Sequence, residues 1–280
     1  MDSRAGVAVE FRLLGAVEAW AREGQLQLGP RKQRFLLAVL ALNVNRLVHV
    51  DRLVALTWSD KPPHTAQHAI HVRISQLRAL LAKAAADGDG VEIDTQGSTY
   101  VLRADPMRVD AHRFRALVAR SRSATNDHEK VAVLREALDM WHGPPLADAA
   151  SPEVAAQLFG GLQEMRLAAM EECLDAELRL GRHWAVIDEL IELTALYPHR
   201  QHLLGRLMLA LYRAGRTPDA LAIYRAAYRQ LVNELGLEPE LQLQKLHTAI
   251  LRGEPALDLP RPAGQARHVP LPTVAFAAPA

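Results

Sequence analysis

The chain has 280 residues, of which 49% are hydrophobic and 23% charged, enough for two domains with substantial cores. Its formal net charge of +1 does not by itself indicate a nucleic-acid partner, and the single Cys173 excludes an intrachain disulfide. The N-terminal residues lack the apolar core of a signal peptide and the longest apolar run, Phe35 to Leu42, is too short to span a bilayer, so we expect a cytoplasmic protein without a membrane segment.

Residues 9–58 contain short runs of strand character followed by two helical segments. Glycines punctuate the strand-like runs, which indicates a small antiparallel sheet made of residues 9–14, 17–20 and 25–28. A helix with a broad apolar face is predicted from Arg31 to about Asn43. A second, shorter helix is predicted from Val50 to Trp58.

A longer helix is predicted from Thr65 to Ala86, with two distinct faces. Apolar residues recur at i, i+4, i+7 and i+11 and form one stripe, which consists of Ile70, Ile74, Leu77 and Leu81. The second face is polar or small, with basic residues beside it: His68, His71, Val72, Ser75, Gln76 and Ala79, flanked by Arg73, Arg78 and Lys83. No acidic residue occurs between Asp60 and Asp87, so nothing nearby in sequence offsets the basic charge.

A helix with one buried stripe and one acid-free polar face is suited to a DNA major groove. Arginine and glutamine read base edges there, and valine meets thymine methyl groups. Gln76 and Arg73 are the strongest candidates for contacts with base edges or adjacent phosphates, and we expect Val72 and His71 to meet bases. We predict backbone contacts by Ser75, Arg78, His68 and Lys83. An ordinary amphipathic helix with a solvated basic face would show the same pattern, so the helix alone leaves both interpretations open.

The following segment reads as a hairpin, with strands at 91–93 and 99–102 around Gln96, Gly97 and Ser98. The order of sheet, three helices and hairpin is the plan of a winged helix-turn-helix, with the third helix as reader and the hairpin as wing. We therefore predict a DNA-binding domain at 8–104. Ser98 and Thr99 at the wing tip are expected to offer hydroxyl groups to phosphates.

From Val109 onward the pattern is helical without strand signals. Gly181 and Gly215 lie 34 residues apart in similar Gly-Arg turns, which is the tetratricopeptide period. Such helix pairs stack into an array, whereas two unrelated hairpins are the alternative. The predicted fold is mainly α with small β-sheets: an N-terminal winged helix, an all-α tetratricopeptide-like domain at 109–252 and a disordered tail at 253–280. Residues 106–110 read as a junction, so a fragment of residues 1–108 is expected to fold and bind DNA.

Several spaced blocks resemble the OmpR-type winged helix, and more specifically its version in the Streptomyces antibiotic regulatory protein (SARP) family. The blocks are GPRKQRFLL at 29–37, VDRLV at 50–54, Trp58, AIHVRISQLR at 69–78 and YVL at 100–102. In the helical half, Gly215-Arg216, Ala220-Leu221, Tyr224 and ELGLEP at 234–239 are similar to the bacterial transcriptional activation domain of that family. The resemblance covers about residues 8–252.

The resemblance implies a sequence-specific transcriptional activator that acts on the nucleoid. It implies double-stranded promoter DNA bound by two copies on tandem repeats, and recruitment of RNA polymerase holoenzyme through its sigma factor and core subunits. It also implies control of a secondary-metabolite (antibiotic) gene cluster. Relatives often carry Arg at the position of Gln76, so the glutamine makes adenine a candidate in place of guanine. Without a receiver domain before residue 8 or an ATPase after residue 252, we expect no attached switch domain.

No usual catalytic signature occurs, so we predict no enzyme, no catalytic residue and no cofactor. His64, His68 and His71 have metal-ligand spacing, but no carboxylate or thiol lies nearby in sequence to complete a shell, and DNA contact is the preferred interpretation. A protein of another class stays open: the helical array could bind a peptide or small ligand while the winged helix serves as a protein-docking module.

Overall fold

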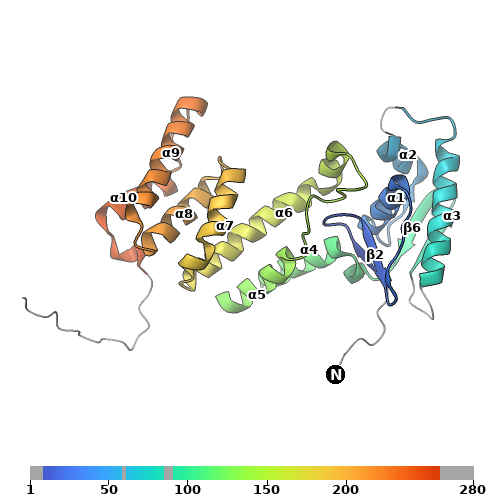
Figure 1. Ribbon diagram of the computed structural model, residues 1–280, viewed down its shortest axis with the longest axis horizontal. Coiled ribbons are helices and arrows are strands. Elements are labelled where there is room, and N and C mark those ends of the chain that lie inside the picture. Colours follow the sequence, from blue (N-terminus) through green and yellow to red (C-terminus); the bar gives the residue numbers. More distant parts are fainter. Residues whose placement is uncertain (1–8, 59–60, 85–90, 259–280) are drawn as a thin grey trace, which may run out of the picture. The chain divides into compact units, whose positions relative to one another are not determined.

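The computed structural model describes residues 9–58, 61–84 and 91–258. The chain divides into two compact units, Met1–Leu180 and Gly181–Ala280, here called unit 1 and unit 2. The expected fold class is confirmed: both sheets are small and lie in the N-terminal winged helix, and the rest of the described chain is helical. Figure 1 labels the helices α1 to α10 and the strands β2 and β6.

Unit 1 begins with the predicted succession of sheet, helices and hairpin. The first sheet is antiparallel with the order β1-β2-β3, and the second has the order β4-β6-β5. The elements are β1 (Glu10–Arg12), β2 (Glu18–Ala21), β3 (Gly24–Gln25), α1 (Arg31–Leu42), β4 (Val48–His49), α2 (Val50–Trp58), α3 (Ala66–Ala84), β5 (Glu92–Gln96) and β6 (Thr99–Arg103). The predicted reader helix and wing are therefore α3 and the β5–β6 hairpin.

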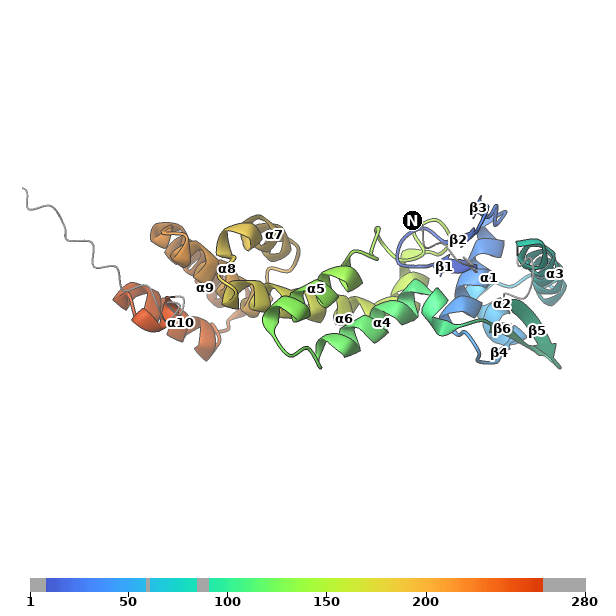
Figure 2. The same ribbon diagram turned by 90° about the horizontal axis from the view of Figure 1, so that it is seen from below.

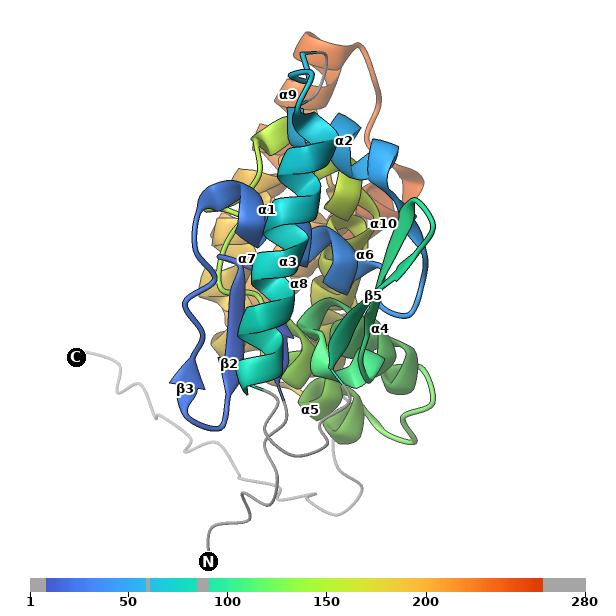
Figure 3. The ribbon, with the colours of Figure 1, turned by 90° about the vertical axis from the view of Figure 1, so that its right-hand side faces the viewer.

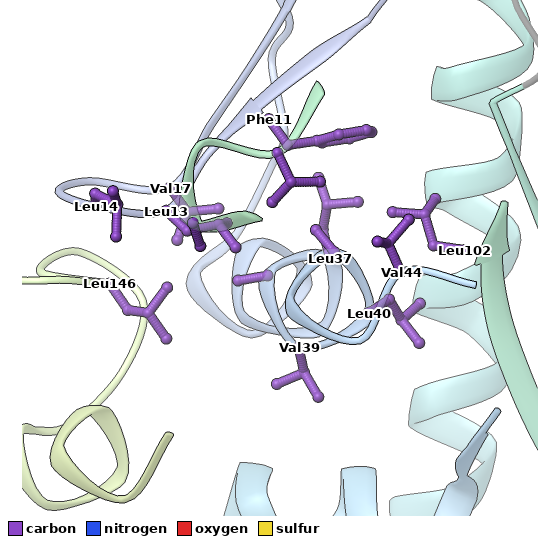
Figure 4. Packing of buried hydrophobic residues seen from close by; sticks show 14 of the residues in the cluster. Phe11, Leu13, Leu14, Val17, Leu37, Val39, Leu40, Val44, Leu102 and Leu146 are labelled. Carbon is purple, nitrogen blue, oxygen red and sulfur yellow. The ribbon is translucent and has the colours of Figure 1, made fainter. Parts of the chain in front are cut away.

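Helix α1 passes through the centre of the core. The sequence predicted one broad apolar face, but every residue from Phe35 to Ala41 is buried, at most 3% exposed. A helix that is apolar on all sides has to be covered on all sides. In Figure 4, Phe11, Leu13 and Val17 lie on one side of α1 and Leu102 on another, while Leu146 comes from a later segment of the chain.

The short strand β4 was not predicted from the sequence. It pairs antiparallel with β6, so that Val48 lies opposite Tyr100 and His49 opposite Thr99. Two residues show too little alternation to indicate a strand. The pairing matters because it joins the start of α2 directly to the wing.

The helices that follow the wing pack against the same core. They are the short 3-10 helix η1 (Pro106–Arg108), α4 (Asp110–Ser121), α5 (Asp127–Leu138) and α6 (Pro152–Arg179). Figure 2 shows α4, α5 and α6 side by side, and α5 contacts both of its neighbours. As the sequence indicated, α6 begins after an N-cap serine and an N1 proline, and the Ser151 hydroxyl accepts from the Val154 N–H at 3.4 Å.

Residues 106–110 do not form an open junction. Phe11 pairs with Val109 in a parallel bridge, and one carboxylate oxygen of Asp110 accepts from the N–H groups of Leu13 and Leu14, at 2.8 and 2.9 Å. Farther along, the Arg34 Nε lies 2.6 Å from a carboxylate oxygen of Asp148. A fragment of residues 1–108 would lose all of these contacts. We therefore place the end of the smallest stable fragment near Leu180 instead.

We predict that Asp110 makes unit 1 less stable as the pH rises. Burial raises the pKa of this carboxyl to about 6 in spite of its three backbone hydrogen bonds, so the folded state holds a proton that the unfolded state releases from a pKa of 3.8. Asp110 therefore adds to the free energy of unfolding below pH 3.8, its pKa in the unfolded chain. This contribution, about 3 kcal/mol in total, is lost as the pH rises through about 6.

Urea unfolding of wild type and Asp110→Asn, each at about pH 4 and about pH 7, measures this contribution. The wild type should lose up to about 3 kcal/mol more than the variant between these two pH values. Equal pH dependence of the two proteins would show that Asp110 does not carry the effect.

Unit 2 consists of α7 (His183–Leu196), α8 (Gln201–Arg213), α9 (Thr217–Leu235) and α10 (Leu241–Arg252). Helix α8 contacts α7, α9 and α10. The two glycines of the predicted repeat hold the same backbone conformation, with φ of 78° at Gly181 and 76° at Gly215. Each glycine directly follows the C-cap residue of a helix, Leu180 or Ala214, where the left-handed conformation ends the helix at the lowest cost for glycine.

The start of the expected tail is folded. Residues Pro255–Leu257 form the 3-10 helix η2, and the Arg213 Nε donates to the Leu257 carbonyl at 2.8 Å. Residues 259–280 lie outside the described part of the chain, as do residues 1–8. Within the described ranges, no helix is both long enough and apolar enough to cross a membrane.

Candidate DNA-binding surface

Helix α3 has the two faces that its sequence predicted. Ile70, Ile74 and Leu77 are at most 1% exposed and face the core, where α3 contacts α1, α2 and β5. The opposite face is exposed and consists of His68, His71, Val72, Ser75 and Gln76. Figure 3 shows α3 at the front, with the wing strand β5 beside it. Val72 is 42% exposed, which leaves its methyl groups accessible to a thymine methyl group.

A cluster of cations lies beside this face. The Lys32 Nζ lies 4.2 Å from the centroid of the Trp58 ring, and burial together with the charges of Arg73 and Arg31 lowers the pKa of Lys32. The Arg73 Nε is buried and has no hydrogen-bond partner among the described residues. Among these described residues, none of the three cations Arg31, Lys32 and Arg73 forms an ion pair with a carboxylate. Repulsion within the cluster would be relieved by a bound phosphate.

Sequence reasoning placed Arg73 in the site but did not include Arg31 and Lys32. The available signal was the basic start of α1, Arg31 to Arg34. That signal did not show which of these basic residues are paired within the protein. Arg34 is paired with Asp148, whereas Lys32 lies close enough to Arg73 to be affected by its charge. Their position at the first turn of α1 adds the positive end of a helix dipole to the cluster.

Arg78 contacts the wing. Its Nε donates to the Ile93 carbonyl at 2.7 Å and its Nη2 donates to the Thr95 hydroxyl at 2.5 Å. Both acceptors lie on β5, so the guanidinium group joins α3 to the wing. The sequence could not show this because β5 lies 15 to 17 residues further along the chain. The predicted backbone contact by Arg78 stays a prediction, and this geometry favours a positioning role.

His71 is held by the wing tyrosine. The Tyr100 hydroxyl and the His71 Nδ1 are 2.6 Å apart, and the rings meet edge to face. Burial raises the pKa of Tyr100, so the phenol stays protonated and can donate. When it donates to Nδ1, the proton of the neutral imidazole lies on Nε2. His71 then offers an N–H donor, which suits a base or phosphate acceptor.

The wing tip is bonded to the start of α2. The Ser98 hydroxyl lies 2.7 Å from the His49 Nε2, and the His49 Nδ1 accepts from the Asp51 N–H at 3.2 Å. The Asp51 carboxylate in turn accepts from the Gln67 amide on α3 at 3.1 Å. The Thr99 hydroxyl donates to the Gln96 carbonyl at 2.6 Å. Both predicted wing hydroxyls are therefore engaged within the protein, and their contact with phosphate stays a prediction.

The predicted site residues are thus brought to one side of the winged helix in two groups. The first group presents exposed side chains on α3 and consists of His68, His71, Val72, Ser75, Gln76 and, near the C-terminal end, Lys83, with Arg73 partly buried beside them. The second group makes intramolecular bonds that fix the wing and consists of Arg78, Ser98 and Thr99. Among the residues that the structure describes, no three histidine, cysteine or acidic side chains form a possible metal site.

Comparison with known proteins identifies both halves of the chain. The profile described as "Transcriptional regulatory protein, C terminal" matches residues 24–102, and "Bacterial transcriptional activator domain" matches residues 109–251. DnrI of Streptomyces peucetius is 34% identical over 257 residues, covering 89% of this chain and 94% of DnrI. The chain belongs to the SARP family. It is a DNA-binding transcriptional regulator and not an enzyme.

Other SARP-family relatives extend the match. RedD of Streptomyces coelicolor is 31% identical, covering 96% of this chain and 77% of RedD. AfsR of the same organism is 37% identical over 89% of this chain, but the chain spans only 25% of AfsR. The solved structure of Mycobacterium tuberculosis EmbR in complex with a low-affinity phosphopeptide is 33% identical with a TM-score of 0.80, covering 89% of this chain and 66% of EmbR.

We predict that Lys32 and Arg73 contact phosphates. Lys32→Ala and Arg73→Ala should each weaken DNA binding. Each should also lower the salt slope, the slope of log affinity against log salt concentration, by about 1, because one counterion fewer is released from the DNA on binding. The measurement is a salt titration of full-length protein by fluorescence anisotropy. The matched control is Arg122→Ala, which removes an exposed charge at the far end of α4. Salt slopes equal to those of the wild type and the control would show that the cluster does not contact DNA phosphates.

Arg78→Ala should weaken DNA binding without lowering the salt slope, because its guanidinium group is bonded to β5. The same variant should increase amide hydrogen exchange in β5, since two bonds that hold this strand to α3 are lost. Arg78→Lys should restore neither property, because an ammonium group cannot reproduce the fork geometry. A slope lowered by about 1 with unchanged exchange in β5 would assign Arg78 to a phosphate instead.

Proposed function

We propose that this protein is a transcriptional activator that binds direct repeats in promoter DNA and recruits RNA polymerase. The proposal is carried by the exposed, acid-free face of α3 beside the cation cluster of Arg31, Lys32 and Arg73, which forms no ion pair with a carboxylate of the described residues. Side chains that can read base edges lie on this helix, and the cations beside them suit phosphates. Family membership favours this function over the alternative in which the winged helix is only a protein-docking module.

The contacts of the wing support a defined placement of α3 on DNA. Arg78 ties the helix to β5, and Tyr100 ties His71 to β6. Ser98, at the wing tip, is bonded to His49 just before α2. A reader helix inserted in the major groove and a wing beside it would then meet the duplex as one rigid surface. One such surface reads one repeat, so two copies in tandem would read two repeats in the same direction.

Unit 2 offers an accessible apolar surface for a protein partner. Trp184 is 64% exposed and Ile191, seven residues later on α7, is 46% exposed. Residues seven apart lie on the same side of a helix, and tryptophan is enriched among residues that dominate protein interfaces. We assign this surface to contact with RNA polymerase holoenzyme. The further assignment to an antibiotic or other secondary-metabolite gene cluster rests on membership in the SARP family.

We predict that Gln76 reads adenine. Its amide can pair with adenine N7 and N6, whereas arginine prefers guanine O6 and N7. Gln76→Arg should shift the preferred base at one operator position from adenine to guanine, by about 1–3 kcal/mol of discrimination, and leave the other positions nearly unchanged. Selection from randomised duplexes, run in parallel for both proteins, measures the shift. Identical sequence preferences would mean that Gln76 solvates the helix or contacts only the backbone.

A double variant with Trp184→Ala and Ile191→Ala should reduce transcription activation several-fold while DNA affinity stays unchanged, because the reader helix lies in the other unit. In vitro transcription and anisotropy on the same promoter provide the two readouts. Leu251→Ala is the matched control, since Leu251 is 60% exposed on α10. Full activation by the double variant would exclude this surface as the polymerase contact without affecting the proposed DNA contact.

A further inference from the structure

Unit 2 contains a groove that none of the functions above uses. Its volume is about 760 Å³, and it is lined by residues of α9 and α10: Ala222, Tyr224, Arg225, Tyr228, Arg229 and His247. Pockets for small molecules commonly have volumes of about 300–1,000 Å³ and are mostly apolar with a few placed polar groups. The groove fits both criteria, because its lining is mostly apolar, with three aromatic residues, and includes the two arginines Arg225 and Arg229.

The aromatic part of the groove contains a stacked, uncharged pair of rings. The rings of Tyr224 and His247 are stacked with centroids 3.8 Å apart and an interplanar angle of 5°. Burial lowers the pKa of His247 and raises that of Tyr224, so both rings are neutral near pH 7. Tyr228 lies one turn further along α9, with its ring centroid 6.3 Å from that of Tyr224 and 39% of its surface exposed. An added flat ring can therefore pack on Tyr228.

The charged part of the groove consists of Arg225 and Arg229. They are four residues apart on α9, so their side chains lie on the same side of the helix. Each Nε donates to a carbonyl of its own helix at 3.3 Å, to Leu221 and Arg225 respectively. Neither guanidinium group pairs with a carboxylate within the described residues, whereas Arg216, at the start of the same helix, lies 2.7 Å from Asp219.

We propose that this groove binds a small planar aromatic anion. The ring packs on Tyr228 beside the Tyr224–His247 stack, and the carboxylate or other acidic group meets Arg225 and Arg229. The charge of Glu238 acts on Tyr224 and would repel an anion from that side, which favours the arginine side for the acidic group. Bidentate pairing with guanidinium groups makes a carboxylate a stronger partner than a neutral amide.

A small molecule fits these observations better than a peptide. Among the described residues, two cationic side chains line the groove, and its volume lies in the range of small-molecule pockets. Such a ligand would bring a chemical signal to unit 2, the unit that does not contain the reader helix. The binding itself does not depend on the proposed promoter function, so the two can be tested separately.

Calorimetric titration of the full-length protein with naphthoate and with naphthamide tests the proposal, because these probes share a ring system and differ in charge. Naphthoate should bind at least about tenfold more tightly than naphthamide. A double variant with Arg225→Gln and Arg229→Gln should bind both probes with the affinity that the wild type shows for naphthamide. Tyr228→Ala should weaken both probes, and Arg252→Gln, which removes an exposed charge on α10, should weaken neither.

Three results would overturn the proposal. They are equal affinity for the two probes, no binding of either probe, and unchanged naphthoate binding in the double arginine variant. The helical circular dichroism of each variant should match that of the wild type, and Arg225→Lys with Arg229→Lys provides a second test that keeps the charge. This lysine variant should retain part of the preference for naphthoate, whereas complete loss would contradict an electrostatic contribution. Binding of an acidic peptide in the absence of naphthoate binding would assign the groove to a protein segment instead.

Discussion

The complete burial of α1 is the constraint on which the rest of unit 1 depends. Its residues 35–41 are apolar on every side, so both sheets, α2, α3 and the segment around Leu146 must cover it. Losing one leucine side chain from such a core costs about 2–5 kcal/mol, against a total stability of about 5–15 kcal/mol. Because α3 supplies one apolar stripe to this cover, its opposite face has to point outward. The exposure of the DNA-binding face is thus a consequence of core packing.

The arginines of this unit serve different purposes, and their contacts decide which. Arg34 is paired with Asp148 and ties the winged helix to a later loop. Arg78 is bonded to the wing, whereas the buried Nε of Arg73, beside Lys32, has no hydrogen-bond partner within the described ranges. Holding like charges together costs stability in the free protein, and a bound phosphate would offset that cost. A net charge of +1 for the whole chain hides this local arrangement.

The blocks that define the family do not coincide with the compact units. The first family profile ends at residue 102 and the second begins at residue 109, but the structure divides between Leu180 and Gly181. The difference arises because α4, α5 and α6 share the core of the winged helix. Asp110, at the start of α4, accepts hydrogen bonds from the N–H groups of Leu13 and Leu14, just after β1. A regulator built in this way connects its DNA-reading part to the first helices of the activator domain without an open linker.

The fold class, the order of the longer elements and the two faces of α3 follow from the sequence alone, because these depend on local periodicity and on turn residues such as Gly181 and Gly215. Contacts between distant segments were decided only by the tertiary structure. No spacing could show that Arg78 would meet β5, that Lys32 would lie beside Arg73, or that residues 106–110 would be packed into the core. Such contacts depend on which surfaces the buried α1 brings together, and the periodicity within one segment carries no information about its contacts with another.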